Sequence, residues 1–379
     1  MSCSSCKCSN GGTGISAVIL DLDGTLIDSE SGSKGVVKDF LAKYGRVMKE
    51  DNKRLGKTLK ESAISIIQDY DLPLSPDQFI QEITPLFREK WLQTKPMPGA
   101  TRLIKHLHKH GVPIALASNS LLDYIETKIS NQNGWRECFS AIVGSDNVKS
   151  GKPSPDIFIE AAERMGVDAA RCLVVEDSLV GVKAAKAAKM KVVAVPSLQE
   201  TDCSSLADIE LNSLLEFEPE KWGLPPFNDW VQGAMPIETT YLSCGSISRF
   251  LYGIQEKGKY VLPNQFSGIF FGWAQVGLQK IFKVVVSIGF RFPNSTRKLQ
   301  VCIIDDCQTQ DQQHLHLSLV GFIRGLKSKE ELTSKDLVIL EDDKSVARES
   351  LELELFKHRP YIHVLGEEEE AGNSCLLLE

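Results

Sequence analysis

Short apolar runs alternate with helical patterns between residues 15 and 215 of the chain. Uninterrupted apolar runs predict buried strands at 17–20, 114–117, 141–143, 172–175 and 192–195. Apolar residues spaced three and four positions apart predict amphipathic helices over 100–110, 155–165 and 179–189. Strands that are apolar on both faces and alternate with helices are typical of a parallel sheet covered on both sides. This part of the chain is therefore predicted to be α/β, with a Rossmann-like parallel sheet.

The stretch between Asp28 and Pro96 contains no strand pattern. Apolar residues instead recur at helical spacing over 37–44, 59–70 and 79–87. We therefore expect a small helical subdomain at about residues 29–97, inserted directly after the first strand.

The hydrophobic period changes to two in the second half of the chain. Residues 216–235 contain several prolines and tryptophans, which predicts a linker that packs against a domain. Beyond it, alternating apolar residues predict antiparallel strands at 267–276, 281–290, 299–306 and 314–324. A charged helix is predicted over roughly 328–356. We expect residues 236–360 to form a small antiparallel β-barrel with this C-terminal helix.

These patterns divide the chain into two domains with flanking segments. The α/β domain occupies residues 14–215, the linker residues 216–235 and the barrel domain residues 236–360. A flexible tail is expected at 1–13 and an acidic tail at 361–379.

Composition and charge narrow the classes of partner. The 379 residues carry a net charge of -7, so no basic excess exists to drive binding to a nucleic-acid backbone. The chain has no run of 18 apolar residues and no secretory signal, so we expect neither membrane insertion nor secretion. Several of the ten cysteines, such as Cys172 and Cys302, lie in strand patterns, which indicates reduced thiols and a cytoplasmic protein. The oligomeric state leaves no signal in the sequence.

Polar residues follow the predicted strands of the first domain at their carboxyl ends. In strand order they are Asp21 and Asp23, then Ser118 and Asn119, then Lys152 past a loop, and finally Glu176 and Asp177. Ligands of open parallel sheets bind at the carboxyl ends of the strands. We therefore expect these side chains to meet at one edge of the sheet.

The chemistry of these side chains favours phosphate esters. A cluster of carboxylates repels itself unless a cation lies among them, and the oxygens of Asp21, Asp23 and Asp177 suit Mg²⁺. Lys152 and Ser118 suit a phosphate group. A carboxylate beside Mg²⁺ can attack a phosphoryl group and form an acyl phosphate. A second carboxylate two residues later can protonate the leaving oxygen and then activate water.

The same residues resemble the motifs of the haloacid dehalogenase superfamily of phosphatases. The family's DxDGT motif is matched by "DLDGT" at 21–25, its strand-ending serine by "ASN" at 117–119, its lysine by Lys152 and its acidic pair by "EDS" at 176–178. The resemblance implies that Asp21 is the nucleophile and that Asp23 is the general acid/base, with the backbone carbonyl of Asp23 on the metal.

The resemblance also implies roles for the remaining residues of the set. Ser118 and Lys152 would hold the phosphoryl group, and Thr25 and Asn119 would bind substrate. Asp177 would ligate Mg²⁺. Glu176 would either help to hold the metal through water or orient Lys152.

The helical insertion at about 29–97 stands where the family carries a cap that selects substrates. Its segment "LGKTLKE" (55–61) resembles the cap loop that reaches back to the active site. Lys57 is therefore a candidate substrate contact, and a solvated lysine at the start of a helix is the alternative.

Nearly the whole chain is similar to the plant-type bifunctional riboflavin kinase/FMN phosphatases. In the second half, "SGIFFGWA" (267–274), "VVVSIGF" (284–290) and "LVGFIR" (319–324) carry this resemblance. It implies that the substrate of the phosphatase is FMN and that the products are riboflavin and phosphate.

The kinase motifs of that family are altered in this chain. The family's Pro-Thr-Ala-Asn motif, whose Thr and Asn bind Mg²⁺, is absent from 252–268, where Asn264 follows a proline but no threonine is present. Gln300 stands in the place of the catalytic glutamate, and an amide cannot accept a proton from a hydroxyl. We expect that the kinase fold is kept and its activity lost.

Three alternatives remain at this point. The phosphatase can act on a small sugar, polyol or nucleoside phosphate, because all of these esters share the anchoring group with FMN. The chain can retain riboflavin kinase activity and be bifunctional. It can also be a non-catalytic flavin-binding protein built around the altered barrel.

Overall fold

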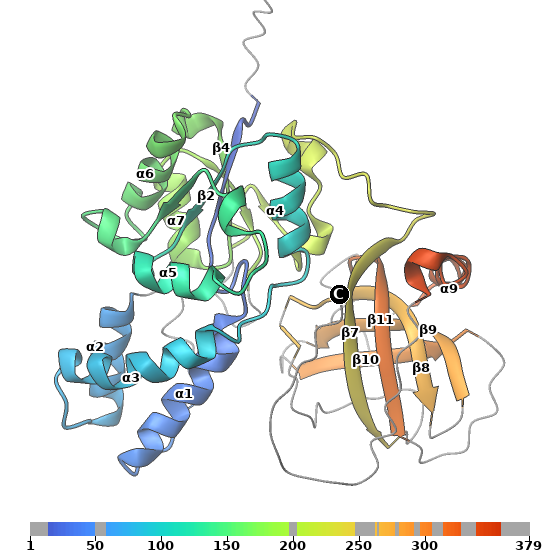
Figure 1. The fold of residues 1–379 in the computed structure, drawn as a ribbon, viewed down its shortest axis with the longest axis horizontal. Helices are drawn as coiled ribbons and strands as arrows, with labels where there is room; N and C mark the ends of the chain where they lie inside the picture. The colour runs from blue at the N-terminus through green and yellow to red at the C-terminus, as the bar shows by residue number, and fades with distance from the viewer. Residues whose placement is uncertain are drawn as a thin grey trace, which may run out of the picture.

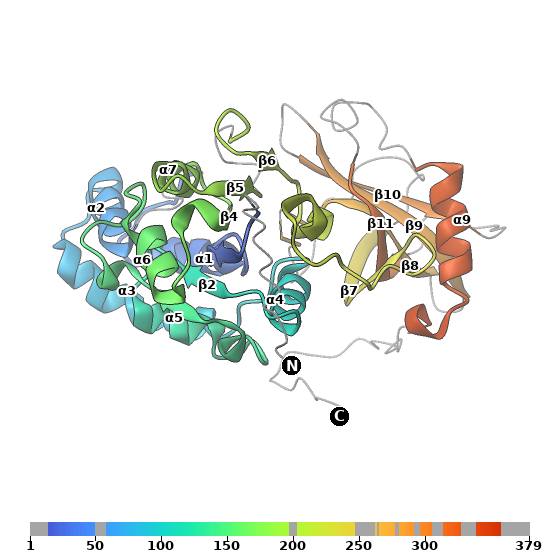
Figure 2. The same ribbon diagram turned by 90° about the horizontal axis from the view of Figure 1, so that it is seen from above.

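The computed structural model describes residues 14–49, 58–196, 203–246, 262–263, 265–276, 280–291, 296–304, 314–326 and 339–357. The tails at 1–13 and 361–379, and the residues Lys57 and Asn264, lie outside these ranges. A parallel sheet with its helices and an antiparallel sheet lie side by side in the molecule (Figures 1 and 2).

The first sheet has six parallel strands in the order β3-β2-β1-β4-β5-β6. Their bounds are β1 Ala17–Leu20, β2 Ile114–Ala117, β3 Ala141–Val143, β4 Cys172–Glu176, β5 Lys191–Ala194 and β6 Ile209–Glu210. The central strand β1 pairs with β2 on one side and with β4 on the other. The five strands predicted from apolar runs are confirmed, and the short edge strand β6 was not predicted.

Helices cover both faces of this sheet, as the continuous apolar strands require. On one face, Val18 and Leu20 pack in a core with Leu103 and Leu107 of α4 (Ala100–Lys109). On the other face, Ile19 packs with residues of α6 (Asp156–Met165) and α7 (Leu179–Ala187). The predicted helices at 100–110, 155–165 and 179–189 are thus confirmed, whereas α5 (Leu122–Ile129) was not predicted.

Three helices form the insertion after β1: α1 (Ser29–Lys43), α2 (Leu59–Tyr70) and α3 (Pro76–Trp91). The starts of α2 and α3 are fixed by capping boxes, Thr58 with Glu61 and Ser75 with Gln78. The apolar faces of the three helices share one core, in which the rings of Phe40 and Phe79 meet edge to face at 5.0 Å. The predicted helical insertion is confirmed.

The second sheet is antiparallel and has the strand order β10-β9-β8-β11-β7. Its strands are β7 Met235–Ser246, β8 Gly268–Val276, β9 Lys280–Arg291, β10 Thr296–Ile303 and β11 His314–Arg324. Alternate residues of β8 face opposite sides: Phe270 and Ala274 join one core, and Phe271 and Trp273 join the other. The described residues show no ladder between β10 and β7, so closure into a barrel stays a prediction.

The C-terminal helix is shorter than its sequence pattern indicated. α9 spans Glu341–Ser350 rather than roughly 328–356, because Leu340 precedes it in an extended conformation and a separate turn of 3-10 helix follows at Glu354–Phe356. Residues 327–338 lie outside the described ranges. α9 packs on the core that contains Phe271 and Trp273. The strand β7 at the edge of the sheet was also not predicted.

The linker packs down as predicted from its composition. Trp222 and Phe227 contact the core that includes α4. Arg102 of α4 forms a bidentate ion pair with Asp229, with both N–O distances at 2.6 Å.

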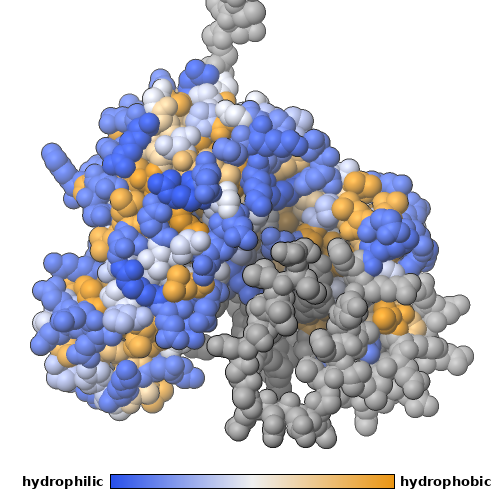
Figure 3. All heavy atoms as spheres, viewed as in Figure 1, coloured by the Kyte–Doolittle hydropathy of each residue, from blue (hydrophilic) through white to orange (hydrophobic). Residues whose placement is uncertain are grey.

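Hydrophilic residues predominate on the surface of the α/β part in Figure 3, with scattered apolar patches. None of the described helices is long and apolar enough to cross a membrane.

Candidate active site

The site begins where β1 ends and the chain turns sharply. The amide of Asp21 donates to the carbonyl of Val175 at 3.0 Å, which extends the pairing with β4 by one residue. Gly24 then takes a φ of +84°, and its amide donates to the carbonyl of Ile27 at 3.0 Å. A Cβ at Gly24 would lie 2.2 Å from an Asp177 carboxylate oxygen, so only glycine fits both the turn and this close approach.

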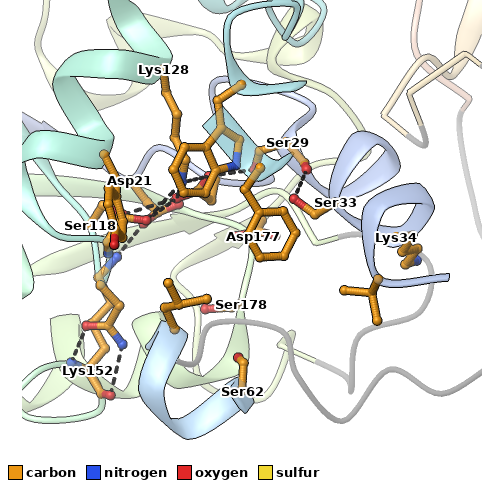
Figure 4. A pocket seen from close by; sticks show the side chains of 18 of the residues that line it. Asp21, Ser29, Ser33, Lys34, Ser62, Ser118, Lys128, Lys152, Asp177 and Ser178 are labelled. Atoms are coloured by element: carbon orange, nitrogen blue, oxygen red, sulfur yellow. Dashed lines mark hydrogen bonds and ion pairs between the residues drawn. The ribbon is translucent and has the colours of Figure 1, made fainter. Parts of the chain in front are cut away.

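Lys152 joins two of the predicted carboxylates at the floor of the site. Its Nζ lies 2.5 Å from Oδ1 of Asp21 and 2.7 Å from Oε1 of Glu176, and all three side chains are buried. Figure 4 shows Lys152 and Asp21 in the pocket. The second carboxylate oxygen of Glu176 accepts hydrogen bonds from the amide and hydroxyl of Ser178. Of the two roles implied for Glu176, the structure thus displays the contact that orients Lys152.

Burial and the neighbouring charges shift the pKa values of Asp21 and Lys152. Burial raises the pKa of Asp21 to about 7, with Lys152 opposing the rise and Glu176 adding to it. Burial disfavours the charged form of Lys152, but the charges of Asp21 and Glu176 outweigh it and raise the pKa of the ammonium above its ordinary value. Lys152 is therefore a permanent cation in the floor of the site.

Asp177 completes a cluster of three carboxylates with Asp21 and Glu176. One oxygen from each residue lies within 4.8 Å of the others, and all three residues are buried. Thr25 supports the cluster, since its hydroxyl donates to Oδ1 of Asp177 at 3.3 Å and its side chain is fully buried. The structure thus places Thr25 on Asp177, a contact that the sequence did not indicate.

Ser118 and Asn119 follow β2 at the same edge. The Asn119 side chain accepts from the Lys152 amide at 2.8 Å and donates to the Lys152 carbonyl at 3.2 Å. Asn119 therefore holds the backbone that carries Lys152. Ser118 lies beside Asp23, with its hydroxyl donating to Oδ2 at 3.3 Å.

Asp23 lies apart from the carboxylate cluster, in a polar nest of its own. Lys128 donates to both carboxylate oxygens, at 2.7 and 2.8 Å, and the hydroxyls of Ser29 and Ser120 also donate to them. Burial alone would raise the pKa of Asp23, but the Lys128 charge and these hydrogen bonds outweigh burial and hold the pKa below its ordinary value. The Asp23 carboxylate is thus held ionised beside a cation.

Lys128, Ser29 and Ser120 were not identified from the sequence. The position of Lys128 could have marked it as a site residue, because it shares the buried face of α5 with Ile125 and Ile129. A lysine on an apolar face needs a buried partner. Its ammonium also lies 4.8 Å from the centre of the Trp91 ring in the cap, so it touches both walls of the site.

A cavity opens between this polar edge and the cap helices. Its floor includes Asp21, Asp23, Lys152 and Asp177. Its opposite wall is mostly apolar and comes from α1, the segment that follows α1, α2, α3 and α5. The apolar side chains of this wall are Val37, Met48, Leu59, Ile66, Phe79, Phe87, Trp91 and Tyr124. The site therefore combines an ionic floor with an aromatic and aliphatic roof.

Comparisons with known proteins found the following similarities. The family model for haloacid dehalogenase-like hydrolase matches residues 15–189, and that for Riboflavin kinase matches residues 254–351. The bifunctional riboflavin kinase/FMN phosphatase of Arabidopsis thaliana is 43% identical over 371 residues, covering 92% of this chain and 97% of that protein. The (DL)-glycerol-3-phosphatase 2 of Arabidopsis thaliana is 36% identical over 228 residues, and the match covers 57% of this chain and 94% of that protein. CbbY from Rhodobacter sphaeroides, solved in complex with phosphate, aligns with a TM-score of 0.48 at 26% identity, covering 53% of this chain and 96% of that chain.

The fold and the site define a haloacid dehalogenase-type phosphatase joined to a riboflavin kinase-like domain. More particularly, the chain belongs to the family of the bifunctional riboflavin kinase/FMN phosphatases. The family resemblance that the sequence motifs indicated is thereby confirmed.

Proposed function

We propose that this chain is a Mg²⁺-dependent phosphatase that hydrolyses FMN to riboflavin and phosphate. The observation that carries the proposal is the cavity itself. Its floor brings Asp21, Asp177 and Lys152 together, and its roof is aromatic and aliphatic. Such a cavity matches an ester with a doubly charged phosphate at one end and a large flat ring system at the other.

The carboxylate cluster fits a magnesium ion. Every candidate ligand is an oxygen, and Asp21, Glu176 and Asp177 offer oxygens within 4.8 Å of one another. We propose that Asp21, Asp177 and the backbone carbonyl of Asp23 hold the ion, with Glu176 close by. When bound, the ion would offset the negative charge that the phosphoryl group brings to the carboxylates.

Asp21 is the proposed nucleophile. One of its carboxylate oxygens bonds to phosphorus while the bond from phosphorus to the ribityl oxygen breaks. Asp23, which is ionised in the ligand-free site, must first take up a proton from solvent, and it then donates that proton to the ribityl oxygen. In the second half of the reaction Asp23 accepts a proton from water, which attacks the phosphorus of the aspartyl phosphate and releases phosphate. Lys152 and Ser118 hold the phosphoryl oxygens throughout, and Asn119 and Thr25 keep Lys152 and Asp177 in place.

The roof supports FMN over smaller esters. Rings of Phe79, Phe87, Trp91 and Tyr124 line it, and Phe87 and Trp91 stack at 5.6 Å. A glycerol or sugar phosphate has no apolar surface to bury there, whereas an isoalloxazine ring has a large one. The relative in Arabidopsis thaliana whose name includes FMN phosphatase supports the same substrate. Lys57, which lies outside the described residues, stays a candidate contact for it.

For the second domain we propose that riboflavin kinase activity is lost. Gln300 lies on β10 opposite Ser287 of β9, in the place where the family carries its catalytic glutamate. Its Oε1 is buried and has no hydrogen-bond partner in the described part of the chain. An amide oxygen cannot take the proton of a hydroxyl as a carboxylate can. The stretch in which the Pro-Thr-Ala-Asn motif is expected lies mostly outside the described residues.

The location that we propose is the cytoplasm. Cys138 and Cys172 are buried free thiols. Buried thiols without disulfide partners are typical of a reducing compartment, where FMN and riboflavin are small soluble reactants.

A substrate panel tests the proposed function. The purified chain with Mg²⁺ is offered FMN, glycerol 3-phosphate and pseudouridine 5′-phosphate, and phosphate release is measured. We expect FMN to give the highest kcat/KM, EDTA to stop the reaction and added Mg²⁺ to restore it. Asp21→Asn should lower the rate by roughly 10⁴-fold or more, because the nucleophile is gone.

Asp39→Asn is the matched control, because Asp39 is exposed on cap helix α1 and should leave the rate unchanged. Preference for glycerol 3-phosphate or pseudouridine 5′-phosphate would contradict the substrate. Turnover that survives Asp21→Asn or EDTA would contradict the covalent, metal-assisted mechanism.

A further inference from the structure

One side chain of the C-terminal domain reaches into the catalytic edge of the phosphatase domain. Gln265 precedes β8, and its Nε2 donates to the carbonyl of Gly24 at 2.7 Å and to the carbonyl of Val195 at 2.9 Å. Gln265 is only 2% exposed. Two carbonyl oxygens accept these bonds, so the amide nitrogen must face them, and the orientation of the side chain is fixed by chemistry.

The two carbonyls belong to loops that build the active site. Gly24 follows the proposed general acid/base Asp23 and is bonded through its own carbonyl carbon to Thr25, which supports Asp177. Val195 follows β5, and its amide donates to the carbonyl of Glu176 at 2.7 Å. Gln265 therefore ties the loop after β1 to the end of β5 at the edge where the carboxylates gather.

Apolar packing around Gln265 stabilises its two hydrogen bonds. Leu215, from the end of the phosphatase domain, packs in the core of the antiparallel sheet with Leu262 and Phe266, which flank Gln265 in sequence. The apolar contact excludes water from the two hydrogen bonds. Their loss would leave two buried carbonyls unsatisfied, which is costly in such an environment.

We infer that Gln265 is a positioning residue for the phosphatase reaction, and that the kinase-like domain thereby supports the catalytic loop of the other domain. The inference rests on the proposed phosphatase function and extends it. It gives the kinase-like domain a structural role in phosphatase catalysis, although we propose that this domain has no kinase activity. The tie orients the peptide between Gly24 and Thr25, and through it Asp23 and Asp177.

The test compares Gln265→Met with Ser267→Ala in the full chain. Methionine keeps the length of the side chain and removes the amide. Ser267 is also buried in the same segment, but its hydroxyl donates to the carbonyl of Ile288 inside its own sheet, at 3.4 Å. We expect Gln265→Met to lower kcat for p-nitrophenyl phosphate and FMN about tenfold to hundredfold, with KM nearly unchanged. Ser267→Ala should leave both constants as in the parent.

Hydrogen exchange gives a second readout that needs no activity. In Gln265→Met the peptide covering residues 20–28 should exchange faster, while a peptide from β9 exchanges as before. Should the Met variant fail to fold, Gln265→Asn supplies the same readouts, because it keeps the amide but shortens its reach by one carbon.

Unchanged exchange of residues 20–28, or an unchanged kcat, would overturn the inference. Faster exchange in both peptides would overturn it as well, since it would indicate a merely structural role. If the parent chain hydrolyses no ester, the proposed function fails by itself, and the exchange measurement alone decides whether Gln265 holds the loop.

Discussion

Asp21 and Asp23 are two residues apart, yet their surroundings differ. Asp21 shares Lys152 with Glu176 in a buried floor, whereas Asp23 is surrounded by Lys128 and hydroxyl donors. Accordingly, the pKa of Asp21 is raised by burial and that of Asp23 is lowered by its neighbours. Two carboxylates with separate environments can carry separate roles, one as nucleophile and one as acid and base.

The role of Asp23 as acid and base should depend on Lys128. Replacing it with methionine removes the cation that counters burial, so the pKa of Asp23 should rise. Asp23 must be ionised to activate water, and a raised pKa means that this form is lost at a higher pH as the solution is acidified. We expect Lys128→Met to lower kcat at pH 7 about tenfold to hundredfold and to move the acidic limb of the pH profile upward.

The measurement is kcat against pH with p-nitrophenyl phosphate, whose leaving group needs no proton. The profile then reports the water-activating step rather than protonation of the leaving oxygen. Lys128→Arg is the matched control, because it keeps the charge, and its acidic limb should stay near that of the parent. An unmoved limb in Lys128→Met would show that Lys128 does not control Asp23.

At the scale of elements, sequence periodicity predicts what is regular and misses what depends on partners. Five strands of the parallel sheet follow from apolar runs because both of their faces are buried. The edge strand β6 has only two half-buried residues, Ile209 and Glu210, so it carries no pattern to detect. β7 begins at Met235, the last residue of the predicted linker, and the polar residues of the strand concealed its pattern.

The residues of the candidate site also fall into two groups, those that the sequence could predict and those that it could not. Residues at strand ends, such as Asp21 and Asp177, could be predicted because topology alone brings strand ends to one edge. Lys128 and Gln265 come from a helix and from the other domain, and only tertiary packing brings them there. No spacing rule within the chain links Gln265 to Gly24.

The cap helices should determine affinity for the ring of the substrate. Leu59, at the start of α2, is half-buried and lines the cavity. Leu59→Ser removes apolar surface from the roof, and a loss of about 1.4 kcal/mol corresponds to a tenfold weaker complex. We therefore expect the inhibition constant of the product riboflavin to rise about tenfold.

The inhibition constant of inorganic phosphate should stay the same in Leu59→Ser, because phosphate contacts only the ionic floor. Ile64→Ser is the matched control on the same helix, since Ile64 is 38% exposed and does not line the cavity. Equal effects on riboflavin and phosphate, or equal effects of the two variants, would contradict the assignment of the roof to the ring.

At the scale of the whole molecule, the two domains are coupled by packing as well as by hydrogen bonds. Arg102 of α4 is held by Asp229 of the linker and lies 3.4 Å from the centre of the Phe227 ring. His106 of the same helix bonds to the carbonyl of Pro225 at 2.8 Å. The linker is thus anchored to the phosphatase domain, which places the antiparallel sheet where Gln265 can reach Gly24.

The altered kinase-like domain yields the last prediction, which needs a phosphatase-dead background. Any FMN that the second domain made would be hydrolysed by the first, so the assay uses Asp21→Asn with riboflavin, ATP and Mg²⁺. We expect no FMN, because Gln300 cannot act as a base, a role that typically contributes ~10²–10⁴-fold, and the motif threonine is absent. Adding Gln300→Glu separates the two losses: the base returns without the threonine, so turnover should stay absent. The Arabidopsis thaliana relative named as bifunctional is the positive control, and FMN formation by Asp21→Asn would establish an active kinase.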